Sequence, residues 1–69
     1  MNDEVYIAVS AEAAEDRPVA DIVYRGVQWA SLSVKDGESV LTLYATEDGF
    51  DVPVAIALAS IDEARRRLR

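Results

Sequence analysis

The chain contains no cysteine and no histidine. A disulfide is therefore impossible, and so is a zinc site built from thiolate or imidazole ligands. We expect no cofactor. A chain of 69 residues buries only about 60% of the surface that its unfolded form exposes, so small domains often gain stability from disulfides, a metal ion or oligomerisation. Elimination leaves self-association, and we expect a homodimer.

Basic residues are also scarce, with 7 Lys and Arg against 13 Asp and Glu and a net charge of −6. This balance argues against nucleic acid, because phosphate binding depends on clustered basic side chains. No apolar run approaches the roughly 20 residues that a membrane-spanning helix needs. The first residues, Met1–Glu4, are acidic where a secretory signal would be basic. We expect a cytoplasmic protein with neither nucleic acid nor membrane as a partner.

The three glycines all fall at predicted turns. Gly26-Val27 predicts a type II′ turn, and Asp36-Gly37 is the preferred type I′ dipeptide. Together they divide the segment 24–44 into two hairpins that share a strand. The predicted register pairs Tyr24 with Trp29, Val23 with Ala30, Ile22 with Ser31, Lys35 with Glu38, Leu32 with Leu41, Ala30 with Leu43, and Trp29 with Tyr44.

Periodicity predicts an α+β domain, an antiparallel β-meander followed by one helix. Alternating β-branched residues indicate a first strand, and the polar segment 11–18 is assigned to a connecting loop. The predicted strands are 4–10, 19–25, 28–35 and 38–45, and the predicted helix is 53–68.

The helix prediction rests on an apolar stripe and on charge spacing. Acids precede arginines by four residues in the pairs Asp62–Arg66 and Glu63–Arg67, which favours a helix. An alternative is a fifth strand through Ala59, followed by a short helix capped by Ser60. The stripe consists of Val54, Ala57, Leu58, Ile61, Ala64 and Leu68.

The predicted register sorts the sheet into an aliphatic face, which would pack on the helix, and an aromatic face. Asp21 fits this register badly, because it falls on the aliphatic side. The aliphatic face carries Val23, Ala30, Leu32, Val34, Leu41, Leu43 and Ala45, with Val5, Ile7 and Val9 from the first strand. The predicted interaction surface on the aromatic face consists of Tyr6, Ile22, Tyr24, Trp29, Val40 and Tyr44.

Four interpretations of the aromatic face stay open. It can be a dimer interface, a surface covered by the 11–18 loop, a site for another protein or a ligand, or the face on which the helix packs. Tyrosine and tryptophan are typical anchors of protein interfaces, and a large exposed apolar patch is unusual on a monomer. Self-association through this face is the primary hypothesis.

No catalytic constellation is present, and we expect no enzyme. Ser31 and Ser33 have no histidine to act as a base, and Lys35 is paired with Glu38. The acids at 47, 48 and 51 do not match the spacing of a calcium loop. The arginines at 65–67 and 69 are explained by the helix dipole and by their acidic neighbours.

Charge is unevenly distributed along the chain. Residues 1–51 hold 11 acids and 3 bases, a net charge of −8, whereas residues 52–69 hold 2 acids and 4 bases, a net charge of +2. Complementary potentials raise association rates, so an acidic sheet suits a basic partner. The expected function is that of a small acidic interaction domain. The alternative is an acidic inhibitor, comparable in size and charge to an antitoxin or immunity protein, that binds a basic protein.

Overall fold

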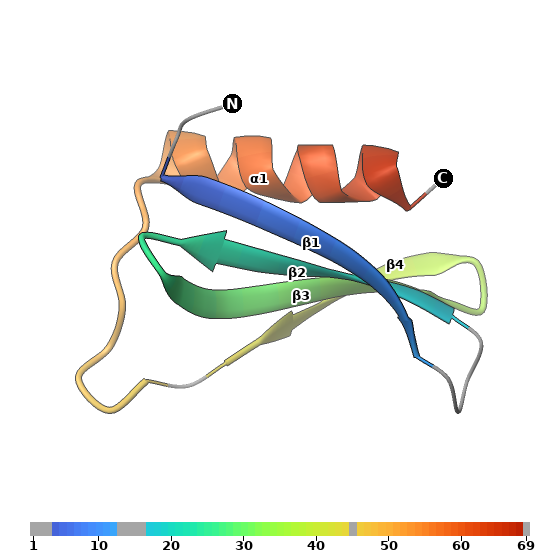
Figure 1. The fold of residues 1–69 in the computed structure, drawn as a ribbon, viewed down its shortest axis with the longest axis horizontal. Helices are drawn as coiled ribbons and strands as arrows, with labels where there is room; N and C mark the ends of the chain where they lie inside the picture. The colour runs from blue at the N-terminus through green and yellow to red at the C-terminus, as the bar shows by residue number, and fades with distance from the viewer. Residues whose placement is uncertain (1–3, 13–16, 45, 69) are drawn as a thin grey trace.

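The fold consists of one open antiparallel sheet with a helix packed against one face (Figure 1). The computed structural model describes residues 4–12, 17–44 and 46–68. The sheet order is β1-β2-β3-β4, which confirms the predicted α+β meander. A fifth strand through Ala59 is wrong, because that residue lies inside α1. The elements are β1 (Val5–Glu12), β2 (Arg17–Tyr24), β3 (Val27–Lys35), β4 (Glu38–Leu43) and α1 (Val54–Arg67).

The first two strands extend into the segment that is predicted to be a loop. β1 continues to Glu12 and β2 begins at Arg17, so the loop prediction for 11–18 is wrong at both ends, and 13–16 lie outside the described residues. Proline is tolerated at Pro18 because the pairing of β2 with β3 ends at Val19. At that position no ladder hydrogen bond to β3 needs an amide hydrogen.

The second hairpin has the predicted turn and register. Asp36 and Gly37 have φ of 52° and 83°, and positive φ at both central residues defines a type I′ turn. Lys35 faces Glu38 and Leu32 faces Leu41 across this hairpin. The predicted pairing of β3 with β4 is confirmed.

The first hairpin differs from its prediction in two ways. Its turn is Arg25-Gly26, with φ of 52° and 83°, so the turn is type I′ and lies one residue earlier than the predicted type II′ turn. Val23 then pairs with Gln28 while Ile22 pairs with Ala30. Trp29 is therefore the extra residue of a β-bulge in β3.

The bulge exchanges the two faces of β2. A turn that lies one residue earlier shifts the pairing of β2 with β3 by two residues, which leaves each side chain of β2 on its predicted face. The extra residue at Trp29 reduces this shift to one residue, so the side chains of β2 beyond the bulge lie on the opposite face. Ile22 consequently lies on the helix side, where the predicted register had placed Val23. Asp21 moves to the opposite face, and its Oδ1 accepts a hydrogen bond from Gln28 Nε2 at 3.0 Å. The misfit of Asp21 disappears.

Small side chains allow α1 to lie close to the sheet. Ala20, Ala30 and Ala64 are fully buried between the two layers. Ser60 is also buried, and its hydroxyl donates to the Ile56 carbonyl at 2.7 Å, which satisfies a polar group inside the helix. The buried core consists of Ile7, Ala20, Ile22, Ala30, Leu32 and Ala64, with Val5, Trp29, Ile61 and Leu68 packed against it.

The predicted helical stripe is correct in part. Ala64 is buried and Ile61 and Leu68 pack on the core, but Val54 and Leu58 are 74% and 63% exposed. The stripe prediction is wrong for these two residues. No helix in the described part of the chain has the length and apolarity to cross a membrane.

Candidate interaction surface between α1 and β4

The structure does not bring the six residues of the predicted aromatic surface together. Tyr6 and Tyr44 are 65% and 45% exposed, and the register places them on the face opposite the helix. Ile22 and Tyr24 lie on the helix side and are buried. Trp29 is half-buried against the core, and Val40, also half-buried, lies on the open face beside polar residues. The six residues do not share a face because the β-bulge at Trp29 places Ile22 and Tyr24 on the face opposite to the predicted one.

Tyr24 is a structural residue. It is 6% exposed, and its ring contacts Phe50 edge to face, with centroids 6.2 Å apart and an interplanar angle of 62°. Burial raises the pKa of the Tyr24 hydroxyl, and the neighbouring Glu4 carboxylate raises it further. This aromatic pair ties the end of β2 to the segment that leads into α1.

The open face of the sheet is mostly polar. The hydroxyls of Ser31 and Tyr44 are hydrogen-bonded at 3.1 Å, and the neighbouring positions of β3 and β4 on this face are Ser33 and Thr42. Tyr6 lies on β1, at the other edge of the sheet. Isolated exposed tyrosines on a polar surface are ordinary for a monomer and do not form a contiguous apolar patch.

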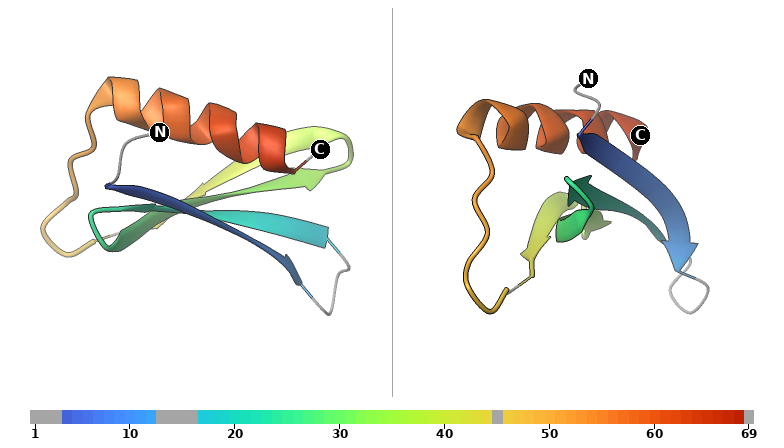
Figure 2. Two further views of the ribbon diagram at one scale, coloured as in Figure 1. Left: turned by 45° about the horizontal axis from the view of Figure 1, so that its top comes forward. Right: turned by 60° about the vertical axis from the view of Figure 1, so that its left-hand side comes forward.

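The helix side of the sheet carries a different exposed surface. α1 runs along β1 and β2 and leaves β4 uncovered (Figures 1 and 2). On this side, large apolar side chains of β3, β4 and the helix flank face solvent. We call this set the α1–β4 apolar surface; with exposed fractions, its members are Val34 (38%), Leu41 (38%), Leu43 (67%), Val54 (74%) and Leu58 (63%).

The orientation of α1 places Val54 and Leu58 on the flank away from β1. Arg67 faces β1, because its Nη1 donates to the Ile7 carbonyl at 3.1 Å. Residues four apart share a helix face, and at 100° per residue both Val54 and Leu58 lie well over 100° around the helix from Arg67. Their side chains therefore extend the apolar surface that β4 begins.

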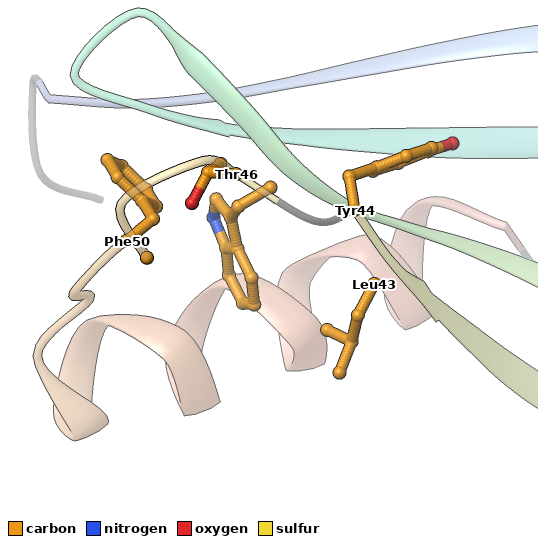
Figure 3. A pocket seen from close by; sticks show the side chains of 6 residues that line it. Leu43, Tyr44, Thr46 and Phe50 are labelled. Atoms are coloured by element: carbon orange, nitrogen blue, oxygen red, sulfur yellow. The ribbon is translucent and has the colours of Figure 1, made fainter.

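A shallow pocket of about 290 Å³ lies where β4 ends and the chain turns towards α1 (Figure 3). Leu43 enters it from the helix side of the sheet, and Phe50 closes the opposite wall. The Trp29 Nε1 atom is buried without a hydrogen-bond partner among the described residues. An unpaired buried donor costs about 1–3 kcal/mol. The pocket is lined by Trp29, Leu43, Tyr44, Thr46, Gly49 and Phe50.

β4 lacks the features that normally protect an edge strand. Edge strands usually carry lysine or proline, or are covered by another element. β4 carries a single charge, at its first residue Glu38, and no lysine or proline, and α1 lies over the other strands. β4 thus combines a free edge with an apolar side.

The ionisable side chains form no metal-binding group in the described part of the chain. No three carboxylates come close enough to hold a metal ion there. The predicted helix pairs are present, with Arg66 Nη1 3.8 Å from Asp62 Oδ2 and Arg67 Nε 3.0 Å from Glu63 Oε2. Arg66 Nη2 also donates to Glu63 Oε1 at 2.5 Å, and the hydrogen bonds from Arg67 and Arg66 lower the pKa of the Glu63 carboxyl. This cluster organises the end of α1.

Comparison with protein-family models, with curated proteins and with solved structures finds no significant match to this chain. The proposed function therefore rests on the α1–β4 apolar surface alone.

Proposed function

We propose that this protein is a non-enzymatic interaction domain that self-associates through the α1–β4 apolar surface. One observation carries the proposal: Leu43 and Leu58, from different elements on the same side of the sheet, are each about two-thirds exposed. Full burial of a leucine contributes about 1.5–3 kcal/mol, so burying the exposed part of each contributes about 1–2 kcal/mol. A second copy supplies the same side chains again, and a two-fold contact buries both sets at once.

The small core gives the chain a reason to associate. Three of its six buried residues are alanines, which contribute little apolar area. A 69-residue chain without disulfides is near the size at which a core alone supports folding. Self-association would therefore add stability as well as cover the exposed leucines.

Matched charge insertions test which face associates. We expect Leu58→Asp to shift the sedimenting species towards monomer by at least tenfold in dissociation constant, because it buries a carboxylate in an apolar contact. Tyr6→Asp introduces the same charge at an equally exposed position of the open face, and we expect no shift. Equal effects of the two substitutions, or a wild type that sediments as a monomer at high micromolar concentration, would overturn the proposal.

The acidic residues beside the pocket support a second candidate function, capture of a basic protein. Glu47, Asp48 and Asp51 are exposed there, next to Phe50 in the pocket wall. Salt separates the two candidates. Screening reduces repulsion between two copies of a chain with net charge −6, so self-association strengthens with salt, whereas binding of a basic partner weakens.

A further inference from the structure

We propose, building on self-association, that the two copies pair β4 with β4 in an antiparallel register with Leu41 opposite the Leu41 of the second copy. The two sheets then form one continuous sheet, and both helices lie on the same side of it. Four observations support this arrangement: the free backbone groups of β4, the number of them that this register pairs, the apolar side that β4 presents, and the contact of Arg67 at the edge of β1.

The hydrogen-bonding pattern fixes which backbone groups of β4 face outward. Tyr44 N donates to Trp29 O at 3.0 Å, and Lys35 and Glu38 flank the two-residue turn. Residues alternate between the two edges of a strand, so the even-numbered residues of β4 bond to β3. Ser39, Leu41 and Leu43 consequently present their N–H and C=O groups at the free edge.

The extent of pairing selects one register among those that the outward groups allow. Centring the two-fold axis on Leu41 sets Ser39 against Leu43, so that all three outward residues of β4 pair with outward residues of the second copy. Centring it on Thr42 leaves Ser39 without a partner inside β4, and centring it on Val40 sets Leu43 against Gly37, which lies in the turn. The Leu41 register is the one that pairs all three outward residues.

The same register joins the apolar surfaces. The side chains of Leu41 and Leu43 lie on the helix side of the sheet, because they pair with Leu32 and Ala30 of the core face. A two-fold axis perpendicular to the sheet keeps both helices on that side. The exposed leucines of the two β4 strands then meet between the two α1 flanks that carry Leu58.

At the other edge of the sheet, a side chain of α1 occupies an outward-facing carbonyl of β1. Arg25 N donates to Glu4 O at 2.8 Å, so by alternation the Ile7 carbonyl faces the free edge of β1. Arg67 Nη1 occupies that carbonyl at 3.1 Å. A further chain that pairs with β1 would have to displace this contact, which favours association of two copies over a filament.

Single-cysteine variants measure the register directly, because the natural chain has no thiol. A disulfide requires Cα atoms about 4.4–6.8 Å apart, and directly opposed antiparallel residues meet this condition. We expect Leu41→Cys to form a disulfide-linked dimer at least tenfold faster than Val40→Cys or Thr42→Cys. Val9→Cys on the β1 edge is the control and should cross-link no faster than these two.

A proline variant tests the backbone pairing without touching the apolar side chains. Ser39 faces outward, so Ser39→Pro leaves the hydrogen bonds to β3 intact. We expect it to weaken the dimer at least tenfold while circular dichroism stays unchanged, and Ser39→Ala to behave as the wild type.

The outcomes separate this inference from the proposed function. If the wild type is dimeric but the cysteine variant at position 40 or 42 cross-links fastest, the Leu41 register is overturned. If the wild type is dimeric but none of the β4 cysteine variants cross-links, strand pairing is overturned and self-association is left in place. A monomeric wild type overturns both.

Discussion

Arg25 occupies a backbone conformation that favours other residues. Its φ of 52° lies in the left-handed region, where asparagine, aspartate and glycine are preferred in type I′ turns. The equivalent position of the second hairpin is Asp36, which suits this conformation. The ion pair of Arg25 with Glu4 spans 3.7 Å between exposed side chains, and such pairs contribute little.

Arg25→Asn should therefore stabilise the protein, by about 0.5–1 kcal/mol. Urea denaturation measures the difference in the free energy of unfolding. Asp36→Asn is the matched control, and we expect a change within about 0.5 kcal/mol because aspartate already fits its turn. Destabilisation by Arg25→Asn would mean that the contact with Glu4 outweighs the backbone preference.

Trp29 combines a packing role with an unsatisfied donor. Its ring packs against the core while its Nε1 atom is buried without a described partner. Trp29→Phe keeps most of the ring and removes the donor, so we expect stability within about 1 kcal/mol of the wild type. Trp29→Ala should cost about 3 kcal/mol. If both substitutions destabilise equally in urea titrations, the indole N–H makes a stabilising hydrogen bond.

At the scale of elements, α1 and β1 are joined by the chain of contacts from Glu63 through Arg67 to the Ile7 carbonyl. Glu63 Oε2 accepts from Arg67 Nε at 3.0 Å, and Arg67 Nη1 donates to Ile7 O at 3.1 Å. One side chain therefore links the last turn of the helix to the edge of the sheet. Sequence spacing predicts the Glu63–Arg67 pair, but the contact with Ile7 spans 60 residues and leaves no local signal.

Arg67→Ala should open the edge of β1 to a further copy. We expect species larger than a dimer in size-exclusion chromatography, since the Ile7 carbonyl would then be free at the outer edge of each sheet. Arg65→Ala removes the same charge at an exposed position and should leave the size distribution unchanged. Identical profiles for the two variants would show that Arg67 does not protect the edge.

The lowered pKa of Glu63 gives the helix end a defined pH dependence. The groups that lower it are Arg67 and Arg66. Because its folded pKa lies below the unfolded value of about 4.3, the stabilisation is complete above that value and is lost as pH falls through the folded pKa. Glu63→Gln should lose less stability than the wild type between neutral pH and the acidic range. Parallel urea midpoints for the two proteins across this range would contradict this expectation.

Much of the fold follows from local signals, and the errors have identifiable causes. Asp36-Gly37 predicts its turn and register correctly because its residues suit positive φ. The turn at Arg25-Gly26 is not predicted, because arginine rarely occupies the first central position of a type I′ turn. No local sequence pattern indicates the extra residue at Trp29. That bulge moves Ile22 and Tyr24 to the core side, so the predicted aromatic surface fails while the predicted elements are confirmed.

The width of the sheet contains a signal for the surface that sequence analysis missed. Strands lie about 4.8 Å apart, whereas a helix with its side chains is about 10 Å across. One helix therefore covers two or three strands of four. A meander followed by a single helix must leave apolar residues of one edge strand exposed, and here they are Leu41 and Leu43 of β4.

Two properties of the whole molecule have opposite effects on the association of two copies: the uncovered apolar edge of β4 and the net charge of −6. Charge repulsion opposes the approach of two copies, and apolar contact favours it. We expect the dissociation constant of the dimer to fall as salt rises from low to near-physiological concentration, because the Debye length shortens to about 8 Å. Sedimentation velocity at several salt concentrations measures this, and weakening with salt would indicate a contact based on opposite charges instead.

The molar mass in solution tests self-association most directly. Light scattering behind size-exclusion chromatography gives this mass independently of shape, and the monomer mass is 7.6 kDa. Self-association through the α1–β4 apolar surface predicts that the wild-type mass rises to twice this value as concentration increases, while Leu58→Asp stays at the monomer value. A wild type that remains at 7.6 kDa throughout the series would contradict it.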